Sequence, residues 1–162
     1  MTQGVHYRAL VADRLAAEQD RRKRLDDRSS AVTTGSAALL SLIVALIALV
    51  KGNEFQVGAT VGVFVVISVI AFAFASGFAM TAGMLRLYKV PTANTFKTML
   101  GTRWTDSEPS QLLACAWMDL DTLLSTREVN NAKAWWLDLA LRVQLGAFVS
   151  LSLAAVVAVV DP

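Results

Sequence analysis

Few residues in this sequence are of the types that carry out catalysis or bind metals. Its 162 residues include one histidine, His6, and one cysteine, Cys115. The one histidine lies near the N-terminus, and no Ser-His-Asp or Cys-His set is indicated. One thiol cannot make a metal site. A Walker loop and a Rossmann glycine signature are also missing. The sequence therefore predicts a protein that is not an enzyme, with no cofactor and no metal, in which Cys115 is buried and inert.

The charged residues form clusters that fit solvated helix faces. Carboxylates that could act as a general acid and base occur side by side at Asp26 and Asp27, and one residue apart at Asp119 and Asp121. A solvated helical surface is the simpler interpretation of both pairs. The basic cluster at residues 21–24 has no aromatic residues among its charges. This composition argues against a nucleic-acid partner.

Three long uncharged segments set the fold class. Residues 57–85 contain no Asp, Glu, Lys, Arg or His, and residues 31–50 and 143–160 are also uncharged. As a helix, the first of these segments would be about 43 Å long, whereas the hydrocarbon core of a bilayer is about 30 Å thick. The mean hydropathy of the chain is +0.50. The prediction is an all-α integral membrane bundle with three transmembrane helices and cytoplasmic helical extensions.

The basic residues predict the topology of these spans. Seven Lys and Arg residues precede the first span, one lies between the first and second, seven lie between the second and third, and none follows. Cytoplasmic segments of membrane proteins are enriched in Lys and Arg. The N-terminus is therefore expected in the cytoplasm and the C-terminus outside, with the first span as a retained signal anchor.

The spans divide the chain into four parts. Residues 1–30 read as a charged cytoplasmic helix, which is either simply solvated or packs on a partner or on anionic lipid. Residues 31–89 form a transmembrane hairpin with a short outer turn at 51–55. Residues 90–142 are a cytoplasmic loop and an amphipathic helix, and residues 143–160 are the third span.

The amphipathic helix has a start signal and an apolar row. Thr105 and Glu108 fit a capping box. The helix is expected to run from the cytosol straight into the third span, with room for a bend near Asn130 and Asn131. Apolar residues recur every three or four positions, as on one face of a helix. These residues are Leu113, Trp117, Leu120 and Leu124.

Small residues recur at four-residue spacing in the spans. Such ridges let helix backbones approach each other closely in lipid. The contacts could be made within one chain or between copies, and the spacing does not choose between them. The residues predicted to pack in this way are Gly58, Gly62, Ala75, Ala79, Gly83, Gly146, Ser150 and Ala154.

The order of these elements resembles a known family. A charged helix, a hairpin with almost no outer loop and a cytoplasmic helix lead through the segment 130–134 (NNAKA) into 135–140 (WWLDLA). This pattern, with the juxtamembrane segment 24–30 (RLDDRSS), resembles the transmembrane effectors of bacterial Pycsar anti-phage systems, and more loosely the SLATT-type membrane effectors. The resemblance implies a self-associating protein that damages the inner membrane when signalled.

The resemblance also suggests a partner and a contact site. The implied signal is a cyclic nucleotide or a related messenger, bound either by the assembled cytoplasmic helices or by a separate sensor protein. Arg127, Asn131 and Lys133 are the candidates for contacting a phosphate or a partner, unless they are the solvated face of a helix end. The alternative function is a structural or accessory subunit of a larger membrane complex. A small channel or transporter ranks below both, because no span carries a central ionisable residue.

Overall fold

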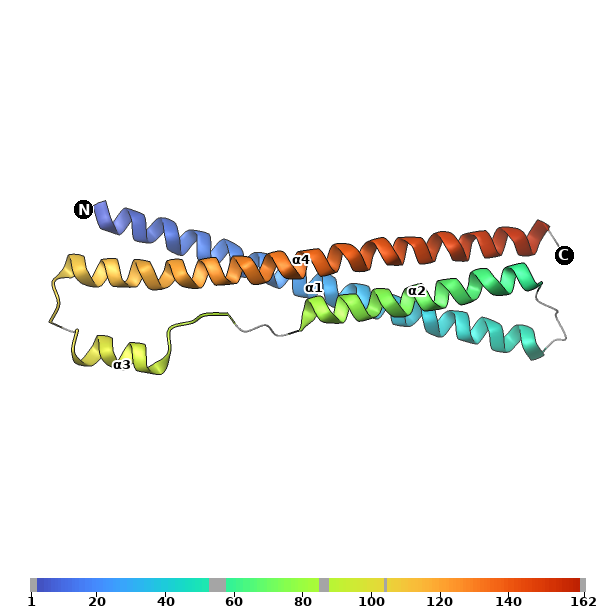
Figure 1. Ribbon diagram of the computed structural model, residues 1–162, viewed down its shortest axis with the longest axis horizontal. Coiled ribbons are helices and arrows are strands. Elements are labelled where there is room, and N and C mark those ends of the chain that lie inside the picture. The colour runs from blue at the N-terminus through green and yellow to red at the C-terminus, as the bar shows by residue number, and fades with distance from the viewer. Residues whose placement is uncertain (1–2, 53–57, 85–87, 104, 161–162) are drawn as a thin grey trace. The chain divides into compact units, whose positions relative to one another are not determined.

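The fold is entirely helical in the residues that the structure describes. The computed structural model describes residues 3–52, 58–84, 88–103 and 105–160, which form four helices and no strand (Figure 1). The predicted all-α class is confirmed. Three of the four described helices, α1, α2 and α4, are long and apolar enough to cross a membrane. The helices are α1 (Gln3–Gly52), α2 (Ala59–Gly83), α3 (Ala93–Gly101) and α4 (Glu108–Val160).

Two of these helices continue from a polar or amphipathic segment into a predicted span, as the sequence predicts for the amphipathic helix and the third span. α1 combines the charged helix and the first span without a break. α4 combines the amphipathic helix and the third span, and it stays helical through Asn130 and Asn131. The reason is the absence of helix breakers: no Pro or Gly lies between residues 5 and 34, or between residues 110 and 145.

The helix ends differ in detail from the sequence prediction. α2 is bounded by Gly58 and Met84, while residues 57 and 85 of the predicted span lie outside the described residues, as do 53–55 of the outer turn. The predicted capping box is wrong, because Glu108 is the first residue of α4 rather than the third. Instead, the Ser107 carbonyl accepts from the backbone N–H groups of Ser110 and Gln111. At α3, the Thr92 hydroxyl accepts from the Thr95 N–H at 3.3 Å.

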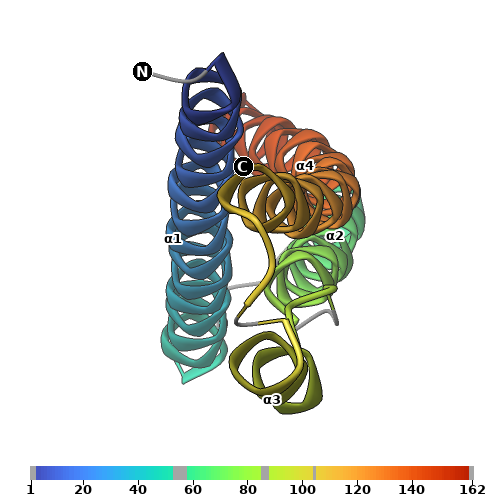
Figure 2. The same ribbon diagram turned by 90° about the vertical axis from the view of Figure 1, so that its left-hand side faces the viewer.

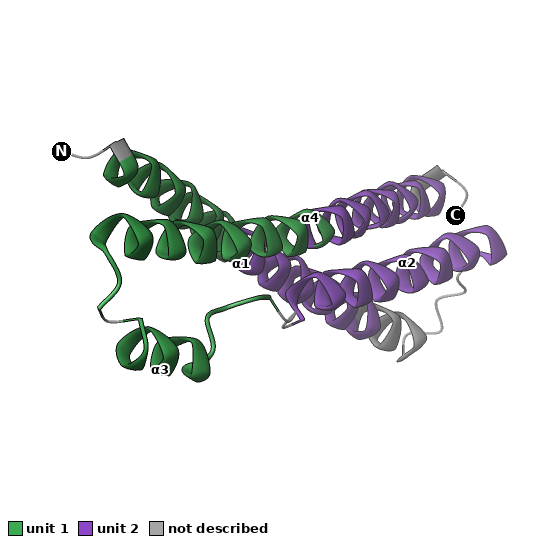
Figure 3. Cartoon of the chain, turned by 60° about the vertical axis from the view of Figure 1, so that its left-hand side comes forward, with its two compact units in different colours: residues 1–24, 85–132 green, residues 25–84, 133–162 purple. Residues whose placement is uncertain are grey.

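The chain divides into two compact units (Figure 3). Unit 1 comprises Met1–Arg24 and Leu85–Ala132, and unit 2 comprises Leu25–Met84 and Lys133–Pro162. Each unit therefore contains a segment of α1 and a segment of α4. Unit 2 also holds α2, and unit 1 also holds α3.

Unit 2 is a three-helix bundle. Its α1 and α4 segments run in the same direction and α2 runs in the opposite one (Figure 1). The buried residues of α2 are spaced alternately by four and three. This 3.5-residue period is that of left-handed coiled-coil packing. The buried α2 residues are Ser68, Phe72, Ala75, Ala79 and Ala82.

Unit 2 buries small and polar side chains and exposes large apolar ones. One core cluster centres on Val32, Ala79 and Leu137, and a second on Ile43, Phe72 and Ala147. Apart from a few larger residues, the interior consists of alanines and serines. A water-soluble bundle has the reverse distribution. The exposed large apolar side chains include Leu42, Val66, Ile67, Ile70, Phe74, Met80, Leu145, Val149, Leu153 and Val156.

Gly83 lies where α2 approaches α1 most tightly among the described glycines. A Cβ atom at this position would be 2.9 Å from Ser29 Oγ. That hydroxyl is buried and donates to the Ala79 carbonyl oxygen at 2.5 Å. The Ser29 side chain can yield to a methyl group only by leaving this hydrogen bond, so the contact fixes how closely the two helices pack.

We expect Gly83→Ala to destabilise the bundle by about 1–2 kcal/mol, through the crowded contact and the displaced hydrogen bond. The matched control is Gly77→Ala on the same helix, where a Cβ atom would meet nothing within 4 Å. Gly77→Ala should be neutral or stabilising, because alanine has the higher helix propensity. Thermal unfolding midpoints in mild detergent would test this, and equal midpoints for the two variants would contradict it.

Unit 1 places a short helix beside two longer ones. Its α1 and α4 segments run in the same direction, and α3 lies to one side of them (Figure 2). The Tyr88 ring and the Arg22 guanidinium are 4.6 Å apart in a cation–π contact. The Lys89 N–H donates to Ser125 Oγ at 3.2 Å, and Lys89 Nζ lies 3.5 Å from Asp121 Oδ1. These contacts attach the segment between α2 and α3 to the longer helices of the unit.

Candidate functional site

The buried contacts between α1 and α4 in unit 1 are polar. Asn130 is fully buried, and its Nδ2 donates to the Glu18 carbonyl oxygen at 2.8 Å and to Glu18 Oε2 at 2.9 Å. Arg21 Nη1 donates to the same carboxylate at 3.4 Å and to Asn131 Oδ1 at 3.1 Å. An amide and a guanidinium therefore hold the Glu18 carboxylate in one position. Because a displaced register would leave these groups unpaired, the contact specifies how the two helices align.

Two buried polar atoms in the described part of the chain have no hydrogen-bond partner. They are Asn130 Oδ1 in unit 1 and Ser36 Oγ in unit 2. By contrast, the buried hydroxyls of Thr122 and Thr126 donate to carbonyl oxygens four residues earlier in α4. The interiors of both units therefore contain hydroxyl and amide groups at positions where a water-soluble bundle usually has aliphatic side chains.

An ion pair joins α1 and α4 within unit 2. Lys133 is 1% exposed, and its Nζ lies 2.5 Å from Asp26 Oδ1. The Asp26 side chain is 39% exposed. A lysine ammonium is almost never buried without a partner, because its desolvation is so unfavourable. The carboxylate of Asp26 is therefore required for Lys133 to occupy the interior.

The structure does not bring the three predicted contact residues to one surface. Arg127 is exposed, Asn131 is exposed and accepts a hydrogen bond from Arg21, and Lys133 is buried against Asp26. Arg127 and Asn131 belong to unit 1, and Lys133 belongs to unit 2. The three residues as contacts to a phosphate or a partner stay a prediction, and a phosphate would have to displace Asp26 to reach the Lys133 ammonium.

The small residues predicted to pack helices divide into two groups. Ala75, Ala79, Ser150 and Ala154 are buried in unit 2, and Ser150 Oγ donates to the Phe64 carbonyl oxygen at 3.0 Å. Gly83 approaches Ser29, as described above. At the remaining three, a Cβ atom would meet nothing within 4 Å, so the described part of the chain does not pack closely against them. These three are Gly58, Gly62 and Gly146.

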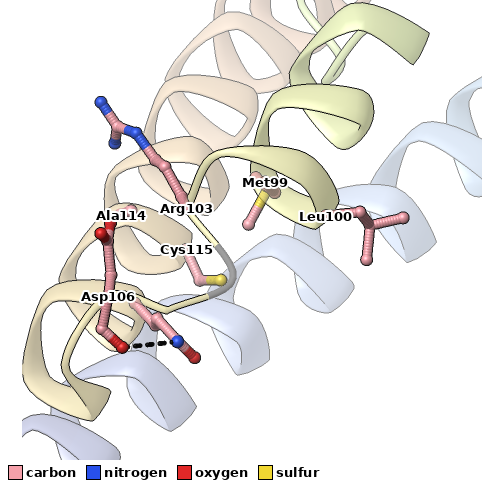
Figure 4. Close-up of a pocket in the computed structure, with 7 residues that line it drawn as sticks. Met99, Leu100, Arg103, Asp106, Ala114 and Cys115 are labelled. Carbon is pink, nitrogen blue, oxygen red and sulfur yellow. Dashed lines mark hydrogen bonds between the residues drawn. The ribbon is translucent and has the colours of Figure 1, made fainter.

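A shallow pocket in unit 1 lies between α3 and the start of α4 (Figure 4). Its volume is about 150 Å³, and its lining includes Met99, Arg103 and Cys115. Gln111 Nε2 donates to the Asp106 carbonyl oxygen at 2.8 Å at its edge. Ligand pockets are typically roughly 300–1,000 Å³, so this pocket is too small for a nucleotide. Within the described ranges, no three His, Cys, Asp or Glu side chains are grouped so that they could hold a metal ion.

The sequence reasoning missed the acidic partners of α4. The sequence predicts a solvated surface for Asp26 and gives Glu18 no role of its own, yet each forms the principal contact of a buried polar group. A signal was present in α1: Val11, Leu15 and Glu18 are the first of a series of inward-facing residues spaced by four and three. Following this series would have placed Glu18 on the packed face of the helix.

Comparison of the chain with protein-family models, with curated proteins and with solved structures gives no match.

Proposed function

We propose that the chain is a self-associating protein of a bacterial inner membrane that disrupts this membrane as an effector of phage defence or phage exclusion. The observation that carries the proposal is the distribution of side chains in unit 2. Leu145, Val149 and Leu153 point outward, while serines and alanines fill the interior. Large apolar side chains on the outside and small ones between the helices suit a lipid environment.

The proposed topology follows the distribution of Lys and Arg. The N-terminus and the charged segments lie in the cytoplasm, the three spans cross the membrane and the C-terminus lies outside. Trp135 is 60% exposed and lies next to Trp136 near the start of the third span. Exposed tryptophans favour the interface between lipid and water, so this pair supports a boundary at that position.

The proposed signal is a cyclic nucleotide or a sensor protein. The pocket beside Cys115 is smaller than a nucleotide needs. In this proposal a nucleotide therefore binds either to a site formed when copies assemble or to a separate sensor protein. Contacts of that partner with the exposed Arg127 and Asn131 are part of the proposal.

The test is the membrane potential of bacteria expressing the full chain, followed with a potential-sensitive dye over several minutes, with and without phage. Depolarisation upon infection is the expected result. An unrelated three-span protein expressed at the same level is the control for the burden of membrane insertion. An unchanged potential in infected cells, with the chain present in the membrane, would contradict the effector function.

A second candidate function is an accessory subunit of a larger membrane complex. Unit 1 favours it through an exposed apolar side of α4, where Leu113 and Trp117 are more than half exposed. An accessory subunit would leave the membrane potential unchanged and would copurify with its complex in mild detergent. An effector would depolarise infected cells without such a complex.

A further inference from the structure

The amphipathic segment of α4 exposes its apolar side. Leu113 is 61% exposed, Trp117 is 64% exposed and Leu124 is 56% exposed, while Leu120 is half-buried. We call these four residues the apolar row. The sequence predicted the row as one face of the helix, and in the described part of unit 1 this face is largely open.

The buried residues of α4 in unit 1 are polar and lie on the side that packs on α1. Asp119 lies 4.0 Å from Arg8, and Asn130 binds Glu18. Thr122 and Thr126 are buried on the same side. An amphipathic helix normally turns its apolar face toward its neighbour. The opposite arrangement leaves apolar surface in water, and exposed patches of this kind commonly mark interaction sites.

The spacing of the apolar row is that of a coiled-coil seam. Leu113, Trp117, Leu120 and Leu124 are separated by four, three and four residues, and the series continues through Arg127 to Asn131. These are the d, a, d, a, d and a positions of a heptad repeat. An asparagine at an a position favours a two-stranded coiled coil and fixes its register.

The charges around the apolar row favour a second copy over lipid. Residues 108–132 contain four acidic residues and one basic residue, a balance that disfavours binding to anionic lipid. Arg127 and Glu128 are both exposed and adjacent. A two-fold axis parallel to two such helices brings Arg127 of each copy close to Glu128 of the other. Self-association therefore gives Arg127, the cation in this series, the Glu128 carboxylate of the second copy as a partner.

We propose that the apolar row is the interface through which two copies pair, α4 against α4 and in parallel. This inference rests on the self-association in the proposed function, since copies in one membrane with one topology present their α4 segments in the same direction. It places Arg127 and Asn131 at the contact with a second copy, which is where the proposed nucleotide site formed by assembling copies would lie. Trp117, as the largest side chain of the row, is the central contact.

The test is disulfide crosslinking of the full chain in bacterial inner membranes. The native thiol is first removed with Cys115→Ser, and Leu124→Cys is then introduced at an a position, where the two copies meet. Copper phenanthroline should oxidise the Leu124→Cys chain to a dimer. The matched control is Ala16→Cys, which is also exposed and in unit 1 but lies on α1 outside the row; it should stay monomeric.

A second variant measures the contribution of the interface. Adding Trp117→Ala to the Leu124→Cys chain should lower the dimer yield about tenfold, because truncated central tryptophans commonly weaken interfaces by that amount or more. Trp117 is mostly exposed in the protomer, so its replacement leaves the fold of unit 1 intact. Equal crosslinking at positions 16 and 124, or a dimer yield unaffected by Trp117→Ala, would overturn the proposal.

The remaining outcomes separate this interface from its alternatives. A Leu124→Cys adduct whose mass differs from that of the dimer would identify a different protein on the row and overturn self-pairing. A thiol at position 124 that is shielded by lipid vesicles but never crosslinked would assign the row to the membrane surface. This result would also overturn self-pairing. Crosslinking in cells that show no depolarisation would support the interface and contradict the effector function. Depolarisation without crosslinking would contradict the interface alone.

Discussion

We expect Asp26→Ala to destabilise unit 2 by about 3 kcal/mol, because it leaves a buried ammonium without its counter-ion. The Lys133 side chain is 2% exposed, whereas that of Asp26 is 39% exposed. Lys133→Met should therefore be much milder, since the remaining carboxylate reaches water and the new side chain fits an apolar interior. The double variant Asp26→Ala/Lys133→Met should be close to Lys133→Met alone. Thermal unfolding midpoints of the four chains in mild detergent measure these differences.

The control for this series is an exposed ion pair on α4, the helix that carries Lys133. Arg142 Nε lies 2.8 Å from Asp138 Oδ2, with both side chains more than half exposed. Exposed pairs of this kind contribute only about 0.3–0.5 kcal/mol, so Asp138→Ala should leave the midpoint almost unchanged. If Lys133→Met lowered the midpoint as much as Asp26→Ala, the difference in burial between the two side chains would not determine the effect of removing either one.

The second large effect is expected from Ala79→Leu. Ala79 is fully buried against Val32, Leu137 and Ala140, where three helices meet. The three carbon atoms that leucine adds have no space there and must push the helices apart. We expect the free energy of unfolding to fall by about 3 kcal/mol. Ala73→Leu is the control, because Ala73 lies on the exposed side of the same helix. Its midpoint should match that of the unmodified chain.

The readout for Ala79→Leu is the same thermal midpoint, together with the yield of folded protein in the membrane. A midpoint for Ala79→Leu that equals that of Ala73→Leu would show that the alanine contacts do not determine the helix spacing. A lower midpoint for Ala79→Leu alone would confirm that the small residues spaced four apart on α2, which include Ala75, Ala79 and Gly83, pack helices together within one chain.

The sequence was sufficient for the helical class and for three segments capable of spanning a membrane. The signals were long uncharged segments such as 57–85, which depend only on local composition. It also placed Ala75 and Ala79 among the packing residues of α2, where both are buried, although Gly58 and Gly62 of the same prediction make no close contact in the described part of the chain. These features do not require knowledge of which helices are neighbours.

The partners of polar residues could not be obtained in this way. The sequence predicts Lys133 as a contact to a phosphate or a partner, or as part of a solvated helix end. Its burial depends instead on Asp26, which is 107 residues away in the chain. The sequence predicts the apolar row as one face of a helix, but it does not show whether this face meets α1 or is exposed. The spacing of Trp117 and Leu124 places them on the same face of α4. Which face of α4 packs on α1 is determined by the polar contact between Glu18 and Asn130. That decision depends on tertiary pairing.

The order in which the bundle can form follows from the contact between Ser29, Ala79 and Gly83. All three residues belong to α1 and α2, so this contact needs no part of the chain after residue 83. Both core clusters, however, need Leu137 or Ala147 of α4. A ribosome delivers chain from the N-terminus at about 5–20 residues per second. The hairpin can therefore assemble during translation, with one side open for several seconds, until the last helix arrives to close it.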